Sequence, residues 1–249
     1  MGRIEQNTDM ANVADTAVVT GSSSGIGLAL SRMLVKNGYE VFGFGRNFER
    51  AEAQEFCKEQ PEKFHAVVCD ITDTQALCAH IKEIDKNYRV TVLVNNAGVG
   101  YYGLHEELNP KKIQKMVRTN LEAPMILTQQ LLRTLKKNRG TVLNISSVTA
   151  AQSNPHGCAY GATKAGLSGF AKSLFDEVRK YGVRVITIQP DMAKTDLYRN
   201  ADFCEGEEEA SYLLPEEVAE AAAFALAQRE GLVVTEITVK PQLHRIRRK

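Results

Sequence analysis

The chain carries Thr20-Gly21-Ser22-Ser23-Ser24-Gly25-Ile26-Gly27 directly after its first β-branched run and at the start of a helix-period segment. Glycine tolerates positive φ and lets a ligand approach the backbone, while free N–H groups at a helix start attract phosphate. A strand, a glycine turn and a helix in this order predict a dinucleotide-binding turn. The alternative is a turn that needs glycine only for tightness. The predicted cofactor-binding residues in this stretch are Gly21, Ser23, Ser24, Gly25, Ile26 and Gly27.

Outward from this turn, short β-branched runs alternate with helix-period segments along the whole chain. Strands separated by helices favour right-handed crossovers and a parallel sheet covered on both faces. The pattern predicts an α/β, doubly wound Rossmann fold, a seven-stranded parallel sheet with helices on both faces. The expected strands are Thr16–Thr20, Glu40–Phe44, Phe64–Val68, Val90–Val94, Thr141–Ile145, Arg184–Gln189 and Val233–Val239, and the expected helices are Ile26–Asn37, Phe48–Gln60, Asp73–Tyr88, Pro110–Lys137, Cys158–Lys180 and Pro215–Gln228. Gly38 and Gly182 stand where helix ends are expected.

Composition narrows the class of protein. The 249 residues are 43% hydrophobic with a formal net charge of +1, which is typical of one globular domain and gives no global field for nucleic acid or a membrane surface. Residues 1–14 are polar and predict a loose tail, and no apolar run is long enough for a signal peptide or a membrane span, so we expect a cytoplasmic protein. Five scattered cysteines without a C-x-x-C pair, and histidines without ligand spacing, predict neither a disulfide framework nor a metal site.

The end of the second expected strand bears on the choice of dinucleotide. An acidic residue at this position accepts hydrogen bonds from the adenine ribose in NAD-binding proteins. Here the sequence reads Phe44-Gly45-Arg46, without a carboxylate. A planar guanidinium can clamp a 2′-phosphate, so Arg46 favours NADP (NADPH) over NAD. Arg46 as a plain surface charge is the alternative.

Further polar residues follow the other expected strands, at the edge of an open α/β sheet where ligands bind. Asp70, followed by Ile71, could accept from the adenine amino group, or serve as a helix cap or turn residue. Asn95-Asn96-Ala97-Gly98 would let the backbone pass close to a ribose, or form a simple turn. From these positions we expect Asp70, Ile71, Asn96, Ala97 and Gly98 to contact the cofactor.

Tyr160 and Lys164 lie four residues apart in an expected helix, and therefore on one face of it. A phenol beside an ammonium is a proton-donor pair, because a fixed cation favours the ionised phenol. Ser147 stands thirteen residues before Tyr160 and could complete the site, with Ser146 as the neighbouring candidate. Taken alone, the same spacing also occurs by chance on solvated amphipathic helices.

The glycine turn, the N-N-A-G turn, a lone Asn in the following helix, the Ser and Y-x-x-x-K occur here in the order and spacing of a known family. From about Thr16 to Val239 the chain resembles the short-chain dehydrogenase/reductases, in the branch with T-G-x-x-x-G-x-G. The resemblance implies an oxidoreductase that transfers a hydride between NADP(H) and a small carbonyl or alcohol substrate. It implies that Tyr160 is the proton donor or acceptor, and that Lys164 lowers the Tyr160 pKa and holds the nicotinamide ribose. It also implies that Ser147 orients the substrate oxygen and that Asn120 distorts its helix and fixes a water. A nonenzymatic NADP(H)-binding sensor on the same fold is the alternative, for which a broken Tyr/Lys pair would be expected.

Other features bear on the substrate and the assembly. The family commonly has Pro-Gly after the sixth strand, whereas this chain has Pro190-Asp191. The resemblance still implies that Pro190 and Thr195 contact the cofactor, with Thr195 at the nicotinamide carboxamide. We expect the Asp191 side chain to point to solvent; the alternative is a carboxylate that faces the pocket and disfavours an anionic group there. Residues 196–214 stand where the family places its substrate lid, and the aromatic rings of Tyr101 and Tyr102 would narrow the substrate mouth or pack in the core. The acidic patch Glu205–Glu209 and the basic segment His244–Lys249 predict two solvated surfaces. The small residues of Cys158–Lys180, with the resemblance, imply a homo-oligomer, a dimer or tetramer.

Overall fold

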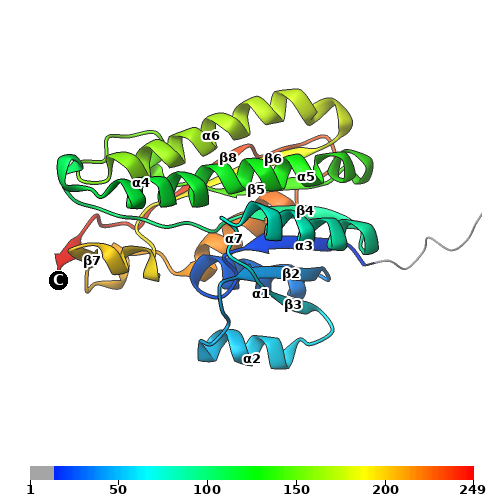
Figure 1. The fold of residues 1–249 in the computed structure, drawn as a ribbon, viewed down its shortest axis with the longest axis horizontal. Helices are drawn as coiled ribbons and strands as arrows, with labels where there is room; N and C mark the ends of the chain where they lie inside the picture. The colour runs from blue at the N-terminus through cyan, green and yellow to red at the C-terminus, as the bar shows by residue number, and fades with distance from the viewer. Residues whose placement is uncertain (1–13) are drawn as a thin grey trace, which may run out of the picture.

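The computed structural model describes residues 14–249, and the predicted tail falls outside them except for Ala14. Seven parallel strands form one sheet in the order β3-β2-β1-β4-β5-β6-β8, which confirms the predicted doubly wound fold (Figure 1). Three of these strands are buried along their whole length and a fourth along all but its first residue, as expected for parallel strands covered on both faces. The strands of this sheet are β1 (Thr16–Thr20), β2 (Glu40–Gly45), β3 (Phe64–Val68), β4 (Val90–Asn95), β5 (Thr141–Ile145), β6 (Arg184–Pro190) and β8 (Glu236–Val239).

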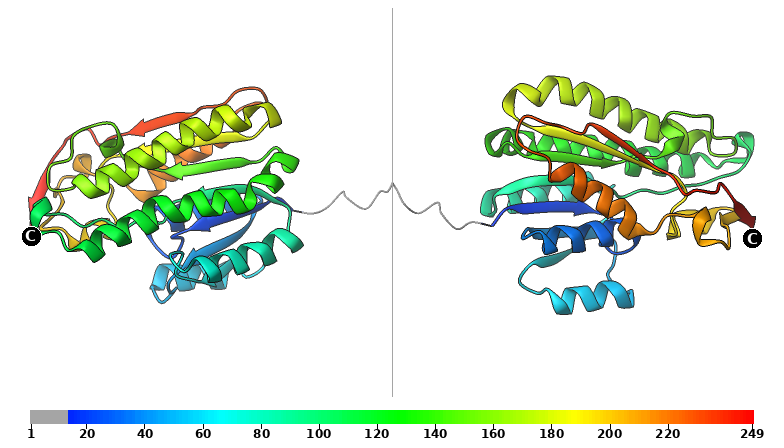
Figure 2. Two further views of the ribbon diagram at one scale, coloured as in Figure 1. Left: turned by 45° about the horizontal axis from the view of Figure 1, so that its top comes forward. Right: turned by 180° about the vertical axis from the view of Figure 1, so that it is seen from behind.

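Helices cover both faces of the sheet, and the views from the front and from behind show a different set on each (Figure 2). Helices α3, α4, α5 and α6 lie on one face, and α1, α2 and α7 on the other. Gly38 and Gly182 adopt φ of 89° and 77° just after helical segments, as expected for residues that end a helix. The helices are α1 (Gly25–Lys36), α2 (Ala51–Glu59), α3 (Thr74–Asn87), α4 (Pro110–Val117), α5 (Ala123–Asn138), α6 (Cys158–Val178) and α7 (Pro215–Leu226).

Alternate residues of each central strand feed two separate cores. Ala17 and Val19 of β1 pack with residues of α1, α2 and α7, whereas Val18 packs with residues of α3, α5 and α6. This follows from the two-residue period of a strand, which sends successive side chains to opposite faces. The sheet is thereby fixed from both sides, and the loops at the carboxyl ends of its strands rest on a rigid base.

Three features depart from the predicted elements. The helix expected over Pro110–Lys137 is interrupted by a π-helical turn at Arg118–Glu122 that separates α4 from α5. A second, two-stranded antiparallel sheet joins β7 (Phe203–Glu205) to β9 (Ile246–Arg248), and neither strand was expected. Each strand has three residues, too few for an alternating pattern to stand out in the sequence. The strand expected at Val233–Val239 begins only at Glu236.

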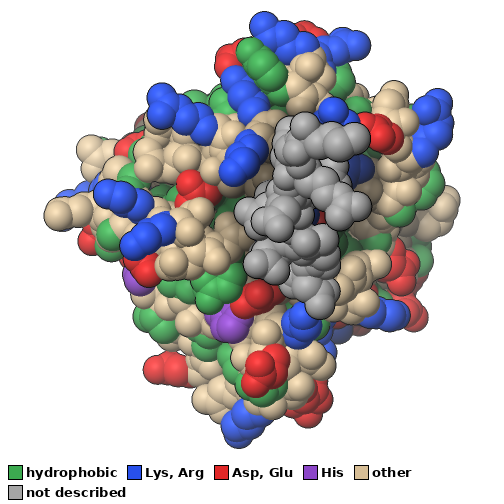
Figure 3. All heavy atoms as spheres, turned by 90° about the vertical axis from the view of Figure 1, so that its right-hand side faces the viewer, with side chains coloured by type: hydrophobic (Ala, Val, Ile, Leu, Met, Phe, Trp, Pro, Cys, Tyr) green, Lys and Arg blue, Asp and Glu red, His purple; other side chains and the backbone are tan. Residues whose placement is uncertain are grey.

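The surface agrees with the nearly balanced composition. On the face where the described chain begins, Lys and Arg side chains are interspersed with Asp and Glu (Figure 3). Over residues 14–249, no helix combines the length and the apolar character needed to cross a membrane. The same residues contain no group of three or more His, Cys, Asp or Glu side chains arranged to hold a metal ion.

Candidate active site

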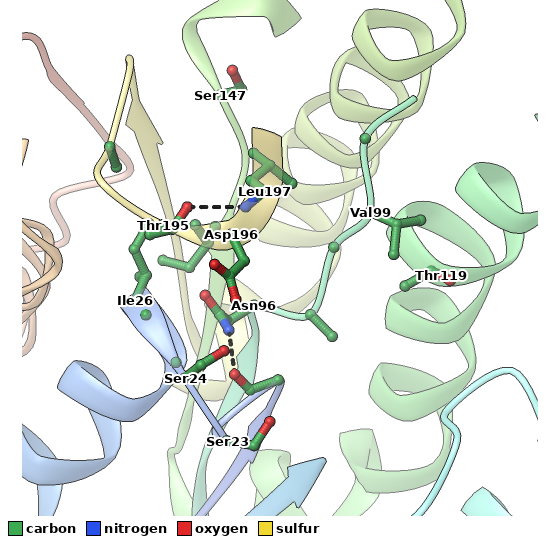
Figure 4. Close-up of a pocket in the computed structure, with 18 of the residues that line it drawn as sticks. Ser23, Ser24, Ile26, Asn96, Val99, Thr119, Ser147, Thr195, Asp196 and Leu197 are labelled. Atoms are coloured by element: carbon green, nitrogen blue, oxygen red, sulfur yellow. Dashed lines mark hydrogen bonds between the residues drawn. The ribbon is translucent and has the colours of Figure 1, made fainter. Parts of the chain in front are cut away.

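One cavity opens at the carboxyl ends of the parallel strands, and it collects nearly all of the predicted site residues. Figure 4 shows Ser23, Ser24 and Asn96 toward one end of it and Ser147 toward the other, with the Thr195–Leu197 segment between them. Of the predicted residues only Asn120 does not line the cavity, although its neighbour Thr119 does. The predicted residues that line it are Gly21, Ser23, Ser24, Gly25, Ile26, Gly27, Arg46, Asp70, Ile71, Asn96, Ala97, Gly98, Ser147, Tyr160, Lys164, Pro190 and Thr195.

The glycine turn is held against the N-N-A-G turn by close backbone packing. A Cβ on Gly21, whose φ is 68°, would lie 2.9 Å from the Ala97 Cα, and a Cβ on Gly27 would lie 2.1 Å from the Gly21 carbonyl oxygen. Asn96 Nδ2 donates to the Thr20 carbonyl at 2.8 Å, and Thr20 Oγ1 accepts from the Asn96 amide at 3.0 Å. These contacts leave an open space lined by backbone at the start of α1. We call this space, formed by residues 21–27, the glycine cradle, and it suits a pyrophosphate.

Ser24 is the N-cap residue of α1, yet its side chain makes no capping hydrogen bond. The hydroxyl is therefore not committed to its own helix and lines the cavity (Figure 4). An unused hydroxyl beside free N–H groups at a helix start adds a donor for an anion. The donor set and the glycine cradle fit a dinucleotide.

At the end of β2 no carboxylate is present. The strand ends at Gly45, and exposed Arg46 follows it on the cavity wall. Asp70 lies across from it, where Asp70 Oδ1 accepts from the Thr72 amide at 2.9 Å and the Thr72 hydroxyl at 2.8 Å. Burial opposes ionisation of Asp70, but the bonds from Thr72 and the nearby cations Arg46 and Lys115 hold its pKa below the usual value. Asp70 is thus a charged turn residue; the cap of α3 is Asp73.

The two serines after β5 have different environments. Ser146 Oγ bonds the Ser168 hydroxyl at 2.8 Å and the Lys164 carbonyl at 3.1 Å, so it joins β5 to α6. Ser147 Oγ accepts from the amide and the hydroxyl of Thr149, which leaves its own proton available to a ligand. This geometry agrees with the choice of Ser147 over Ser146 that the sequence spacing suggested.

Tyr160 and Lys164 are buried side by side on α6, 4% and 3% exposed. The Lys164 Nζ lies 5.8 Å from the centre of the Tyr160 ring and donates to the Ile145 carbonyl at 2.8 Å. Burial raises the pKa of Tyr160, and the neighbouring Ser147 hydroxyl opposes that rise. Burial lowers the pKa of Lys164 to about 8. The Tyr160 pKa is thus raised rather than lowered as expected, and burial of the phenol is the main cause.

Asn120 lies within the π-helical turn and is 1% exposed. Its Oδ1 accepts from the Val99 amide at 2.8 Å, while its Nδ2 donates to the Val99 carbonyl at 2.9 Å and to Thr163 Oγ1 at 3.1 Å. The side chain therefore ties the loop after β4 to α6. The widened turn gives this amide its place between the two elements, in line with the helix distortion that the resemblance implied.

An aromatic wall stands beside Tyr160; we use this name for Tyr102, Tyr198 and Phe203. The Tyr102 ring lies 5.7 Å from the Tyr160 ring, 6.0 Å from Tyr198 and 5.1 Å from Phe203, measured between ring centres. The sequence suggested that Tyr102 narrows the substrate mouth, and the expected lid, residues 196–214, includes both Tyr198 and Phe203. It gave no sign that these two rings pack against Tyr102. Burial raises the pKa of both Tyr102 and Tyr198, so their hydroxyls are neutral at pH 7.

Asp191 differs from its expected position. It lines the cavity and is partly buried, and its Oδ1 accepts from the Met192 amide at 2.9 Å. The carboxylate is thus held against the chain next to the site rather than extended into solvent. A hydrogen bond to the adjacent amide offsets part of the desolvation that made this position unexpected.

Comparisons with known proteins agree with this geometry. Residues 15–203 match a family model described as short chain dehydrogenase. A serine 3-dehydrogenase of Agrobacterium fabrum is 38% identical over 186 residues, which cover 74% of each chain. A 3-oxoacyl-(acyl-carrier-protein) reductase FabG of Rickettsia conorii is 34% identical over 90% of this chain and 93% of its own. An alcohol dehydrogenase structure from Thermococcus sibiricus, complexed with 5-hydroxy-NADP, covers 93% of this chain and 98% of its own at 27% identity, with a TM-score of 0.83.

Proposed function

The chain belongs to the short-chain dehydrogenase/reductase family and is an oxidoreductase, and on that premise we propose that it reduces a small carbonyl substrate with NADPH, or oxidises the corresponding alcohol with NADP. The observation that supports this most is the grouping of Ser147, Tyr160 and Lys164 in one cavity with the glycine cradle. An intact Tyr/Lys pair favours an enzyme over a sensor.

In the direction of reduction, the Tyr160 phenol donates its proton to the substrate oxygen, and Ser147 orients that oxygen through its free hydroxyl proton. A nicotinamide dinucleotide, when bound, supplies the hydride to the carbonyl carbon. Because burial raises the pKa of Tyr160, the phenol is protonated at neutral pH, which is the form that a proton donor needs. Lys164, as the ammonium, compensates the negative charge that develops on the phenol oxygen.

NADP is the proposed dinucleotide because of the residues at the end of β2. Arg46 borders the cavity and offers a planar guanidinium, while Phe44 and Gly45 have no side-chain acceptor for ribose hydroxyls. The 2′-phosphate would add charge-assisted hydrogen bonds to Arg46. The structural relative with 5-hydroxy-NADP supports the same assignment.

The substrate is proposed to be small. The segment predicted as a lid, residues 196–214, is closed at its base, because the Lys194 amide donates to the Leu213 carbonyl and the Leu213 amide to the Met192 carbonyl, each at 2.8 Å. The named substrates of the relatives include serine and an oxoacyl carrier protein, which differ widely in size. A short lid whose rings Tyr198 and Phe203 pack on Tyr102 favours the small end of that range.

A homo-oligomer through α6 is proposed as well. Gly166 packs on Leu121, where a Cβ would lie 3.1 Å from the Leu121 Cδ2, but a Cβ on Gly169 would meet nothing within 4 Å in the described chain. Gly in a helix is unfavourable by roughly 0.5–1 kcal/mol relative to Ala, so a second chain packed near Gly169 would account for it. Sedimentation analysis of wild type and Gly169→Leu tests this, because the larger side chain is expected to weaken such an assembly.

The deciding experiment combines cofactor titration with a screen of carbonyl compounds. NADPH and NADH are titrated separately, and oxidation of NADPH is then followed with small ketones, aldehydes and keto acids. We expect tighter binding of NADPH, turnover on part of the panel, and a fall in kcat of about 10²- to 10⁴-fold in Tyr160→Phe with the NADPH Kd unchanged. Tyr181→Phe, which alters an exposed tyrosine, is the matched control.

Each part of the proposal has its own contrary result. Tighter binding of NADH than of NADPH would contradict the argument from Arg46. Tight NADPH binding without turnover on any carbonyl or alcohol would favour the sensor. Wild-type rates in Tyr160→Phe would refute the role of Tyr160.

A further inference from the structure

The C-terminal segment forms a clasp over the predicted lid; the clasp is residues 243–249. Strand β9 pairs antiparallel with β7, so that Phe203 stands opposite Arg248 and Glu205 opposite Ile246. Backbone bonds extend this pairing at both ends: the Lys249 amide donates to the Asp202 carbonyl at 2.8 Å, and the Gly206 amide to the Arg245 carbonyl at 3.1 Å. Figure 1 shows β7 and the C-terminus together at the end of the molecule to which the parallel strands point.

Side chains of opposite charge reinforce the clasp. Arg247 pairs with Glu207 at 3.1 Å, and Arg245 pairs with Glu208. The Lys249 Nζ donates to the Tyr198 carbonyl at 2.7 Å. The acidic patch and the basic segment, expected as two separate solvated surfaces, are therefore partners across the small sheet, although their side chains stay more than half exposed.

The clasp reaches the candidate catalytic residue through the aromatic wall. Phe203 lies on β7 itself, and Tyr198 carries the carbonyl that Lys249 holds. Their rings lie 5.5 Å apart, and both contact Tyr102, which packs 5.7 Å from Tyr160. A continuous line of contacts thus runs from the last strand to the buried phenol.

Apart from the packing of Tyr198 and Phe203 on Tyr102, few contacts in the described chain hold this part of the lid. The backbone bonds of Met192 and Lys194 with Leu213 close only its base, and the ion pair of Arg50 with Asp196 holds its first residue. Within residues 14–249, β9 is the sole strand paired with β7. The position of Phe203 therefore depends on pairing with a segment about 45 residues further along the chain.

We propose that the clasp positions the aromatic wall, and that this wall shapes the substrate-binding side of Tyr160. The proposal rests on the function proposed above. Arg245, Arg247 and Lys249 are thereby positioning residues: they act on the substrate through Tyr198 and Phe203. An opened clasp would weaken substrate binding while leaving the glycine cradle, and with it the binding of NADPH, unchanged.

Charge-reversal variants on the two strands of the small sheet test the positioning role of the clasp. The variants are Glu207→Arg/Glu208→Arg, Arg245→Glu/Arg247→Glu, and the quadruple variant that combines all four changes. Arg139→Glu breaks the exposed pair with Glu230 at a remote site and serves as the matched control. A fifth chain, ending after His244, removes β9 altogether, and it keeps every residue of the two cores.

Two readouts are followed: KM and kcat for the best carbonyl of the screen, and hydrogen–deuterium exchange of residues 196–206. We expect each double variant to raise KM roughly threefold to tenfold and to speed exchange by a similar factor, the modest scale of exposed pairs. The quadruple variant should return both values to within about twofold of wild type, since the pairs re-form with reversed sign. The truncated chain should show the larger effects, and the NADPH Kd should stay the same in all five.

The outcomes separate the two proposals. Unchanged exchange in the truncated chain would overturn the positioning role, as would faster exchange with an unchanged KM. A double-variant effect that the quadruple variant does not reverse would overturn the role of the ion pairs. If wild type turns over no substrate while exchange responds as expected, the proposed function fails and the mechanical role of the clasp stands.

Discussion

Replacement of Asn120 by Ala removes three hydrogen bonds from a buried position. Two of them satisfy the amide and the carbonyl of Val99, which is 8% exposed, and the third reaches Thr163 Oγ1. Each bond contributes about 1 kcal/mol net, and a buried partner left without a bond adds roughly 1–3 kcal/mol. Thr163 keeps its bond to the Tyr160 carbonyl at 2.7 Å, so the added penalty falls on Val99. The three bonds together contribute about 3 kcal/mol, and water that enters the space left by the side chain can bond the Val99 groups and reduce their penalty to about 1 kcal/mol or less. We therefore expect the free energy of unfolding to fall by about 3–4 kcal/mol.

Thermal unfolding measures this effect. For a chain of this size, 1 kcal/mol shifts Tm by roughly 2–4 °C, so Asn120→Ala should lower Tm by about 6–16 °C. Asn138→Ala is the control, because the Asn138 side chain makes one bond, to the Val90 carbonyl at 2.8 Å, and should lower Tm by only about 2–4 °C. Equal shifts in the two variants would refute the reasoning from hydrogen-bond count.

The same change should also reach the site. Val99 follows Gly98, and both line the cavity. A loosened Val99 would therefore shift the cavity wall, and we expect a raised NADPH Kd and a reduced kcat in Asn120→Ala but not in Asn138→Ala. Loss of stability without any change in Kd or kcat would show that the amide only supports the fold.

Three further predictions concern the cavity. Burial lowers the pKa of Lys164 to about 8, so the ammonium is present below that pH and lost above it. We therefore expect kcat/KM for carbonyl reduction to fall as the pH rises through about 8. A profile that stays flat from pH 7 to 9 would contradict this. Gly27→Ala would put a Cβ 2.1 Å from a backbone oxygen and should abolish NADPH binding in a titration, whereas Gly169→Ala meets nothing within 4 Å and should bind normally. Ser147→Ala should lower kcat about 10²-fold or more, while Ser146→Ala, which loses the bonds to Ser168 and Lys164, should mainly lower Tm; the reverse order of effects would reassign the serines.

The sequence predicted best those parts of the molecule whose signals are local. The strand, glycine turn and helix around Gly21 occupy adjacent residues, and so do Tyr160 and Lys164 on one helix face. Their side chains are placed by the period of the element that carries them, which can be read from spacing. The carboxyl ends of parallel strands then bring these local groups to one edge of the sheet, so their meeting in one cavity follows from the fold.

Features that depend on distant partners could not be predicted in this way. The raised pKa of Tyr160 depends on how completely the surrounding elements bury it, and spacing alone suggested the opposite direction. The π-helical turn at Asn120 matches the family resemblance, but helix periodicity predicted an unbroken helix there. Asp191 was expected in solvent because carboxylates are rarely buried, but segments distant in sequence enclose the cavity whose wall it joins.

The clasp illustrates the same limit and gives it a functional meaning. Glu207 and Glu208 lie about 40 residues from Arg247 and Arg245, so each charge run by itself has the composition of a solvated surface. Only the pairing of β7 with β9 makes them one structure. The proposed proton donor belongs to α6, whereas two of the three rings of the aromatic wall, Tyr198 and Phe203, belong to the lid. We therefore expect changes in residues 243–249 to alter substrate binding without altering proton transfer, so that the two are separable by mutation.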